Sequence, residues 1–340
     1  KQTNKQTTMK NKILALLATI GMVSSVSAVE INENISINGF IDASYKNSDF
    51  TDKSTPAKNE DVSNSQIDEV ELNFIVNAGN VDGELHIDSN DVSNETTLEI
   101  EQVHFTYSFE NGASLKVGRF GSALGFERED PAGLYTNSRA YSTSNEYNRG
   151  DVDSGTVFEG FNIGYAADAF ALSLAVGNGI GATEENNVAE DDYDYELAVT
   201  YTGIENLSVT AGYATQNTSD PKVGAAIDDE DFYSINAAYT LGKLLLGGEY
   251  TSLEKDNSQD RSAYMLLANY TISDKLNATL RYSEWEVDAD TQTDKVTFAA
   301  GYSITSSLGA IVEISTEEVS GGTTAGDETD SLAVELTYSF

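Results

Sequence analysis

The chain has 340 residues, with 56 Asp and Glu against 19 Lys and Arg, and its formal net charge is −37. That balance excludes a nucleic-acid partner, because phosphate recognition needs clustered basic side chains. The sequence holds no Cys, which excludes a disulfide framework and a thiolate metal site. Its hydrophobic content of 39% is too high for a disordered acidic chain.

The first predicted element is an export signal. An apolar run at residues 13–23 follows the basic stretch 10–12 and leads into small residues at 26–28. This order is typical of a secretory signal peptide, and the run is too short to span a bilayer as a helix. We therefore expect cleavage after Ala28. A buried helix or a short anchor is the alternative interpretation.

From residue 29 onward, apolar and polar residues alternate, which is the period of strands whose two faces have unlike surroundings. In one such run, Leu280 and Tyr282 alternate with the polar residues Arg281 and Ser283. Sixteen strands are predicted, at residues 33–46, 67–78, 81–89, 98–110, 113–120, 156–166, 169–177, 193–202, 207–215, 231–241, 244–251, 262–271, 276–286, 294–304, 308–316 and 330–340.

The connections between these strands alternate in length. Tight turns, such as those at 79–80 and 111–112, alternate with longer polar loops, which is the pattern of outer-membrane barrels. We therefore expect an all-β fold: a transmembrane antiparallel β-barrel of about 16 strands with its long third loop folded into the pore. A secreted β-sandwich or a solenoid is the alternative, because both also alternate. The expected division of the chain is residues 1–8 before the start at Met9, a signal peptide over 9–28 and a single barrel domain over 29–340.

Three segments resemble the Gram-negative porins: ISINGFIDASY at 35–45, KVGRFGSALGFE at 116–127 and LTYSF at the end of the chain. The terminal Phe340, with Tyr338 two positions before it, is similar to the assembly signal that the barrel-assembly machinery reads in that family. The resemblance implies a homotrimeric, general-diffusion porin in the outer membrane. Its implied partners are outer-membrane lipids and lipopolysaccharide, the assembly machinery and small solutes.

The third predicted loop, at 121–155, combines charges with apolar residues that a freely solvated loop would not keep, such as Leu124 and Phe126. We expect it to fold inward and form a pore constriction. Basic wall residues, Lys116 and Arg281, would then face its carboxylates, and such opposed charges orient polar solutes. The candidate constriction residues are Glu127, Arg128, Glu129, Asp130, Arg139, Asp151 and Asp153.

Acidic residues dominate the polar face of the predicted strands. Because a cleft of one sign concentrates counter-ions, we expect a cation-preferring pore, unless its narrowest point sets the preference by itself. Arg119 has the parity of the lipid face, so it should lie at the rim or be turned inward by a bulge at Gly118. The wall residues expected are Asp42, Glu71, Glu84 and Glu196, with Glu69, Asp88, Asp194, Glu249, Glu313 and Glu335 on the same parity.

No chemical site is predicted. His86 and His104 share the polar parity, but two histidines without a third ligand make a poor metal site, so pore lining is expected and no metal or cofactor. Acidic runs at 190–192 and 228–231 are expected to be solvated loops, and the alternative is that they bind Ca²⁺ or Mg²⁺ that bridges to lipopolysaccharide. No nucleophile with a histidine base can be recognised in the sequence, so an enzyme is not expected.

The predicted function is passive diffusion of small hydrophilic solutes and ions. The alternatives are a substrate-selective channel, for example for sugars, and a secreted or surface adhesive β protein.

Overall fold

The computed structural model describes residues 28–53, 60–90, 98–128, 131–141, 157–178, 193–217, 229–256, 259–288 and 290–340. Residues 1–27 of the predicted leader lie outside this part, as do Glu129, Asp130, Asp151 and Asp153, the acidic run at 190–192 and residue 228 of the second run. The rest of the second run was expected to be a solvated loop, and this prediction is wrong. Residues 229–231 begin strand β11 (Asp229–Leu241), because pairing with the neighbouring strands continues through them and Glu230 forms an ion pair with Lys255 at 2.9 Å. Among the described residues, no helix is both long enough and apolar enough to cross a bilayer.

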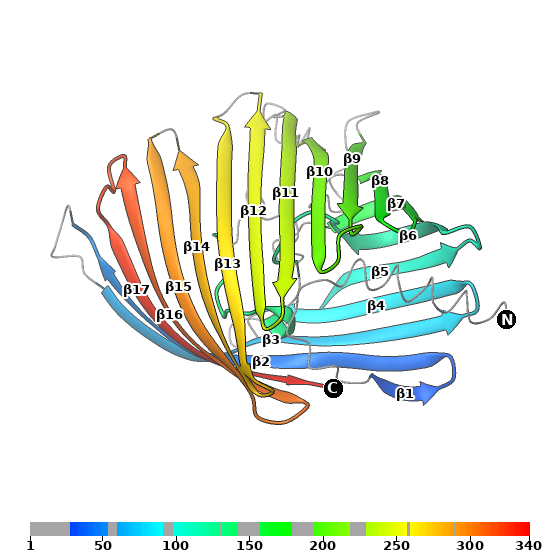
Figure 1. Cartoon of the computed structure of the whole chain (residues 1–340), viewed down its shortest axis with the longest axis horizontal. Coiled ribbons are helices and arrows are strands. Elements are labelled where there is room, and N and C mark those ends of the chain that lie inside the picture. Colours follow the sequence, from blue (N-terminus) through cyan, green and yellow to red (C-terminus); the bar gives the residue numbers. More distant parts are fainter. Residues whose placement is uncertain are drawn as a thin grey trace.

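Sixteen antiparallel strands, β2 to β17, form a closed ring (Figure 1). Each strand pairs with its neighbours in sequence, and the last strand, β17, pairs with β2 from Glu328↔Thr51 to Ser339↔Phe40. The strands are β2 Ile35–Thr51, β3 Glu60–Ala78, β4 Val81–Asn90, β5 Glu99–Ser108, β6 Ala113–Gly121, β7 Val157–Ala166, β8 Phe170–Asn178, β9 Asp194–Tyr201, β10 Leu207–Asn217, β11 Asp229–Leu241, β12 Leu244–Lys255, β13 Arg261–Ser273, β14 Leu276–Asp288, β15 Thr291–Ser303, β16 Leu308–Gly321 and β17 Glu328–Ser339. The predicted barrel and its number of strands are confirmed.

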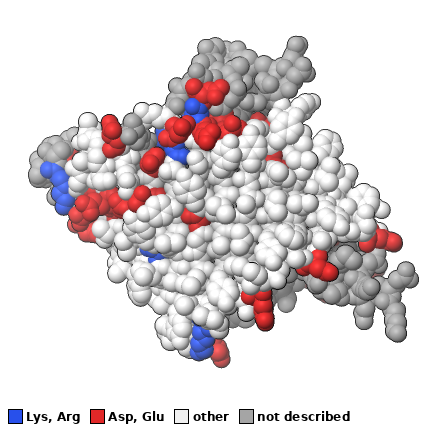
Figure 2. All heavy atoms as spheres, turned by 45° about the horizontal axis from the view of Figure 1, so that its top comes forward, with Lys and Arg blue, Asp and Glu red and all other residues white. Residues whose placement is uncertain are grey.

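The two faces of the strands are inverted relative to a soluble protein. Leu280 and Phe298 are 55% and 48% exposed, whereas their neighbours in sequence, Arg281 and Thr297, are 0% exposed. Figure 2 shows a broad area across the middle of one face that holds few charged residues. An apolar outer surface around a polar interior is the arrangement of a barrel whose outside is covered by lipid chains.

A short additional strand, β1 (Val29–Asn32), was not predicted. It pairs with β2 from Val29↔Ile37 to Asn32↔Ile35, within the stretch of β2 that β17 leaves unpaired. The side chain of Asn32 accepts hydrogen bonds from the backbone N–H groups of Asn34 and Ile35 at 2.9 and 3.0 Å, and so closes the turn. A run of four residues is too short for alternation to be recognised in the sequence.

Among the pairing irregularities of the described strands, two β-bulges lie beside acidic residues. In β3, Asp68 has no partner in the ladder to β2, because Asp42 pairs with Glu69 and the next residue with Ile67. In β5, Glu101 is likewise skipped between the pairs of Gln102 and Ile100 with β4. A bulge reverses the parity of the residues beyond it, so Glu101, outward by alternation from Val103, is turned to the interior and is 8% exposed.

Candidate functional site

The third loop enters the barrel directly after β6. The Ser122 hydroxyl and the Ala123 N–H donate to the two carboxylate oxygens of Glu196 in β9, at 2.5 and 2.6 Å. Glu196 is 2% exposed and belongs to the interior face of its strand. Glu196 therefore binds the first residues of the loop and holds them against the interior face of the wall.

Two apolar side chains anchor the loop further along the wall. Leu124 is 0% exposed and Phe126 is 4% exposed. A Cβ added at Gly212 in β10 would overlap the Leu124 methyl group, and one added at Gly247 in β12 would overlap the Phe126 ring. These interior glycines thus leave room for the loop. Leu124 packs with Ala198, Ala214, Phe232 and Leu253, and Phe126 packs with Ala140, Tyr141, Ala238, Ala263, Met265, Leu267 and Trp285.

Arg281 of β14 is the centre of the polar contacts with the loop. Its Nη1 donates to Glu127 Oε1 at 2.6 Å, to Thr136 Oγ1 at 2.8 Å and to the Ser138 carbonyl at 2.8 Å. Its Nη2 donates to Ser138 Oγ at 3.0 Å and to the Arg139 carbonyl at 2.8 Å. We expected Arg281 to lie on the wall opposite the loop carboxylates. In the structure it is fully buried and contacts Glu127 directly, because a buried guanidinium must be paired and hydrogen-bonded.

The far end of the loop binds two further wall carboxylates. The Ser138 N–H donates to Glu313 of β16 at 3.1 Å, and the Asn137 amide donates to Glu335 of β17 at 2.6 Å. On the loop side, burial raises the pKa of Tyr141, so its hydroxyl stays neutral in this interior. The loop is therefore held on β9, β14, β16 and β17, which together span a large part of the ring.

The two loop arginines within the described part bind the loop itself. Arg139 Nη1 donates to the Glu127 carbonyl at 2.8 Å, and Arg128 Nη1 donates to the Ala123 carbonyl at 3.3 Å. The second carboxylate oxygen of Glu127 accepts the Ala140 N–H at 2.7 Å. Charge-assisted hydrogen bonds of this kind fix the shape of the loop.

The remaining candidates lie on the wall opposite or beside the loop. Asp42 is 1% exposed and accepts a hydrogen bond from Thr337 at 2.9 Å. The Lys116 ammonium lies 5.5 Å from the centre of the Phe120 ring. Glu71 and Glu84 both contact His86. The wall candidates therefore face the interior, as their parity predicts.

Arg119 keeps the outward parity, two residues before β6 ends. Its Nη1 binds Glu159 of β7 at 3.2 Å, and its Nε donates to the Glu101 carbonyl at 2.9 Å. Gly118 has a φ of 134°, yet the ladder to β7 continues through it. Arg119 therefore lies near the strand end with a paired charge, which lowers the cost of an arginine on the apolar face.

Alternation in the sequence places Glu249 on the correct face of its strand and Glu101 on the wrong one. Alternation indicates the interior for Glu249, and it is 6% exposed beside Ser234. Alternation gives the wrong face for Glu101, because the bulge is a property of strand pairing and leaves no mark in the sequence.

A recess lies at the short-turn end of the barrel, below the loop. It has a volume of about 280 Å³ and is lined by Tyr135 of the loop and by Lys243 and Lys275 of two tight turns. Lys243 donates to the carbonyl of Ile272, near the end of β13, and Lys275 donates to the carbonyl of Ile304, just after β15, both at 3.3 Å.

Known proteins share this architecture, as a family model and several solved structures show. A family model described as Gram-negative porin matches residues 14–339. Among solved structures, the anion-selective porin from Comamonas acidovorans has 15% identity and a TM-score of 0.65, covering 90% of this chain and 99% of its own. A Salmonella typhi OmpF complex with daunomycin has 11% identity and a TM-score of 0.66, covering 92% and 100%. A trimer form of Vibrio cholerae OmpT has 15% identity and a TM-score of 0.60, covering 91% and 100%. No curated protein matches the chain.

Proposed function

We propose, because this chain belongs to the Gram-negative porin family, that it conducts small hydrophilic solutes and prefers cations. The family and the fold make it an outer-membrane porin channel. The finer claim concerns what passes through the lumen, and it rests on the charge of the wall and of the third loop.

The observation that carries the cation preference is the sign of the buried wall charges. Arg281, which is 0% exposed, is paired with Glu127 and bound by loop carbonyls, so little of its field reaches the lumen. Acidic residues with less than 9% exposure line many strands: Asp42, Glu69, Glu71, Asp88, Glu101, Asp194, Glu196, Glu249, Glu313 and Glu335. A water-filled passage lined with excess carboxylates concentrates cations.

The Comamonas porin is described as anion-selective, yet its likeness to this chain lies in the fold, at 15% identity. Selectivity depends on the charges that line the narrowest part of the pore, and a shared barrel does not fix those charges. The proposed cation preference therefore rests on the charged side chains of this chain.

The third loop is proposed as the constriction. Glu127 contacts the wall at Arg281, and Arg128 and Arg139 bind the loop beside it. Glu129, Asp130, Asp151 and Asp153 are proposed to add negative charge from outside the described residues. Lys116 and the wall acids would complete the ring around the passage.

A reversal-potential measurement tests the proposal. The purified protein is inserted into a planar bilayer with a tenfold KCl gradient, and the zero-current voltage is recorded. We expect the sign that corresponds to K⁺ passing more readily than Cl⁻. A reversal potential of the opposite sign would overturn the cation preference, and a protein that inserts without conducting would overturn the channel.

Assembly and export complete the proposal. We propose a homotrimer in contact with outer-membrane lipids and lipopolysaccharide, because the outer face is apolar and one similar structure is described as a trimer. Phe340 and Tyr338 are proposed to be read by the barrel-assembly machinery. Cleavage of the leader after Ala28 would leave Val29 as the first residue, which N-terminal sequencing of protein from the outer membrane checks. Cross-linking followed by mass determination checks the trimer.

A further inference from the structure

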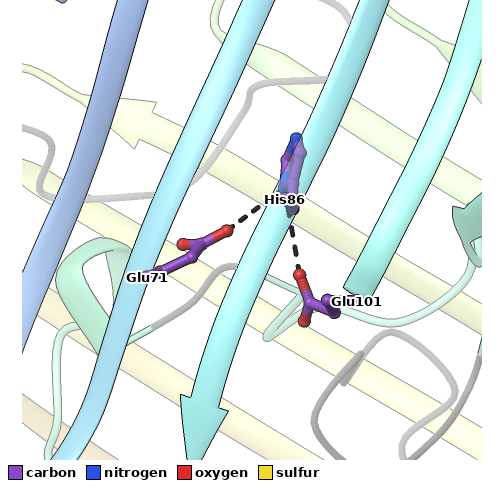
Figure 3. A group of neighbouring side chains, drawn as sticks. All are labelled: Glu71, His86 and Glu101. Carbon is purple, nitrogen blue, oxygen red and sulfur yellow. Dashed lines mark ion pairs between the residues drawn. The ribbon is translucent and has the colours of Figure 1, made fainter. Parts of the chain in front are cut away.

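Two carboxylate side chains from adjacent strands converge on one nitrogen of His86 in the barrel wall (Figure 3). Glu71 Oε1 of β3 lies 3.1 Å from His86 Nδ1 of β4, and Glu101 Oε2 of β5 lies 3.9 Å from the same nitrogen. The three atoms all lie within 4.8 Å of one another. The side chains of Glu71, His86 and Glu101 are 2%, 16% and 9% exposed, so the cluster is largely shielded from water.

The β5 bulge creates this cluster. Without it, Glu101 would share the outward parity of Val103, which is 45% exposed. The sequence pattern indicated no metal site, since His86 and His104 lacked a third ligand. The bulge turns the third ligand inward, so that one imidazole lies between two carboxylates.

The other side of the imidazole determines what its Nδ1 can do. His86 Nε2 lies 3.3 Å from Glu84 Oε2, and because a carboxylate accepts, Nε2 carries the proton there. In the neutral ring Nδ1 is then a lone pair directed at Glu71 and Glu101. Neither Nδ1 nor Glu71 Oε1 makes a hydrogen bond within the described part of the chain, although both are buried. Buried atoms at this distance need a positive charge between them, which either a proton on Nδ1 or a bound metal ion supplies.

The donor set favours one class of cation. One imidazole nitrogen and two carboxylate oxygens suit Zn²⁺ and similar transition metals, whereas Ca²⁺ and Mg²⁺ prefer oxygen alone. Tetrahedral bonds of about 2.1 Å place ligand atoms about 3.4 Å apart, and the distances of 3.1 and 3.9 Å lie on either side of that value. The carboxylate of Glu84 on the second nitrogen is the outer partner that orients metal-bound histidines.

We propose that Glu71, His86 and Glu101 bind a Zn²⁺-class divalent metal ion in the wall of the pore, with Glu84 orienting the imidazole and the fourth position left for water or a passing ligand. The bound ion adds two positive charges to an acidic wall. It therefore lowers the cation current through the channel.

Binding is measured by isothermal titration of Zn²⁺ into the untagged protein in detergent, with millimolar Mg²⁺ present to occupy oxygen-only sites. The protein must carry no histidine tag, because the chain has only two histidines. We expect one site per chain. His86→Gln and Glu101→Gln should each lose that site, and Glu84→Gln should weaken it about tenfold, the usual effect of removing an outer partner.

His104→Gln is the matched control, since it removes the other histidine and none of the three ligands. It should bind Zn²⁺ within about threefold of the parent protein. Each variant is first shown to migrate as a folded barrel on an unheated SDS gel. Equal Zn²⁺ binding by the parent and His86→Gln would overturn the proposal, as would loss of binding in His104→Gln alone. Anomalous scattering at the zinc edge from a soaked crystal should place the ion between the three side chains, and a peak elsewhere would contradict it.

The titration does not depend on conduction. A channel that prefers anions would defeat the proposed function and leave the metal site standing. A cation-preferring channel that binds no Zn²⁺ would support the proposed function and defeat the metal site.

Discussion

The guanidinium of Arg281 donates to Glu127 at 2.6 Å, joining β14 to the third loop across 154 residues of sequence. Both side chains are buried, and the same guanidinium holds the carbonyls of Ser138 and Arg139. One wall residue thus neutralises the loop charge nearest to it and fixes the position of the loop. The position of the proposed constriction depends on this pair.

Replacing Arg281 by alanine should release the loop. The change leaves Glu127 buried without its partner, which costs about 3–5 kcal/mol in other proteins. Because the loop can leave the wall, we expect a larger and noisier single-channel conductance in planar bilayers, with the barrel still folded. Thr297→Val is the control, since it removes only a contact of 3.4 Å to Arg281. An unchanged conductance in Arg281→Ala would show that the loop does not limit the passage.

Adding one methyl group at Gly247 should displace Phe126. The new Cβ would overlap the phenyl ring, and overpacking of this kind costs about 1–3 kcal/mol. We expect Gly247→Ala to expose the loop to limited proteolysis. Gly248→Ala is the matched control in the same strand, because its Cβ would lie 3.2 Å from a methyl group of Leu266, a side chain that is 61% exposed. Equal cleavage of both variants would contradict the anchoring role of Phe126.

Closure of the barrel should be sensitive to Gly39. Its N–H donates to the Phe340 carbonyl at 3.1 Å, and Phe340 donates back at 3.0 Å. A Cβ at Gly39 would overlap the Glu71 carbonyl, which belongs to the backbone and cannot turn aside. We expect Gly39→Ala to lower the fraction of folded, heat-modifiable protein on SDS gels. Gly309→Ala, whose Cβ would meet open space, should fold as the parent does.

Neutralising Asp42 should reduce the cation preference. Asparagine has nearly the same shape and still accepts the Thr337 hydrogen bond, so the change removes mainly charge. We expect the permeability ratio of K⁺ to Cl⁻ to fall, and to fall less in 1 M salt, where the Debye length is about 3 Å. Glu205→Gln on an exposed short turn is the control and should leave the reversal potential unchanged. An unchanged ratio in Asp42→Asn at low salt would remove Asp42 from the selectivity wall.

Alternation along the chain determined the barrel, the number of strands and the face on which Asp42, Glu196 and Arg281 lie, because a strand that separates lipid from water must place its side chains with period two. It did not determine where the strands end. β2 continues to Thr51 and β3 begins at Glu60, beyond the predicted 46 and 67, because hairpin pairing continues through polar residues once the ladder is formed.

Tertiary structure alone decided the partners of those residues. Arg281 binds Glu127, and Glu101 reaches His86, because loop docking and a bulge bring together side chains that no spacing in the sequence relates. Periodicity is a local property of the backbone and can be read from neighbouring letters. Pairing between distant segments depends on register and on which buried charges must be neutralised, and these are fixed only when the ring has closed.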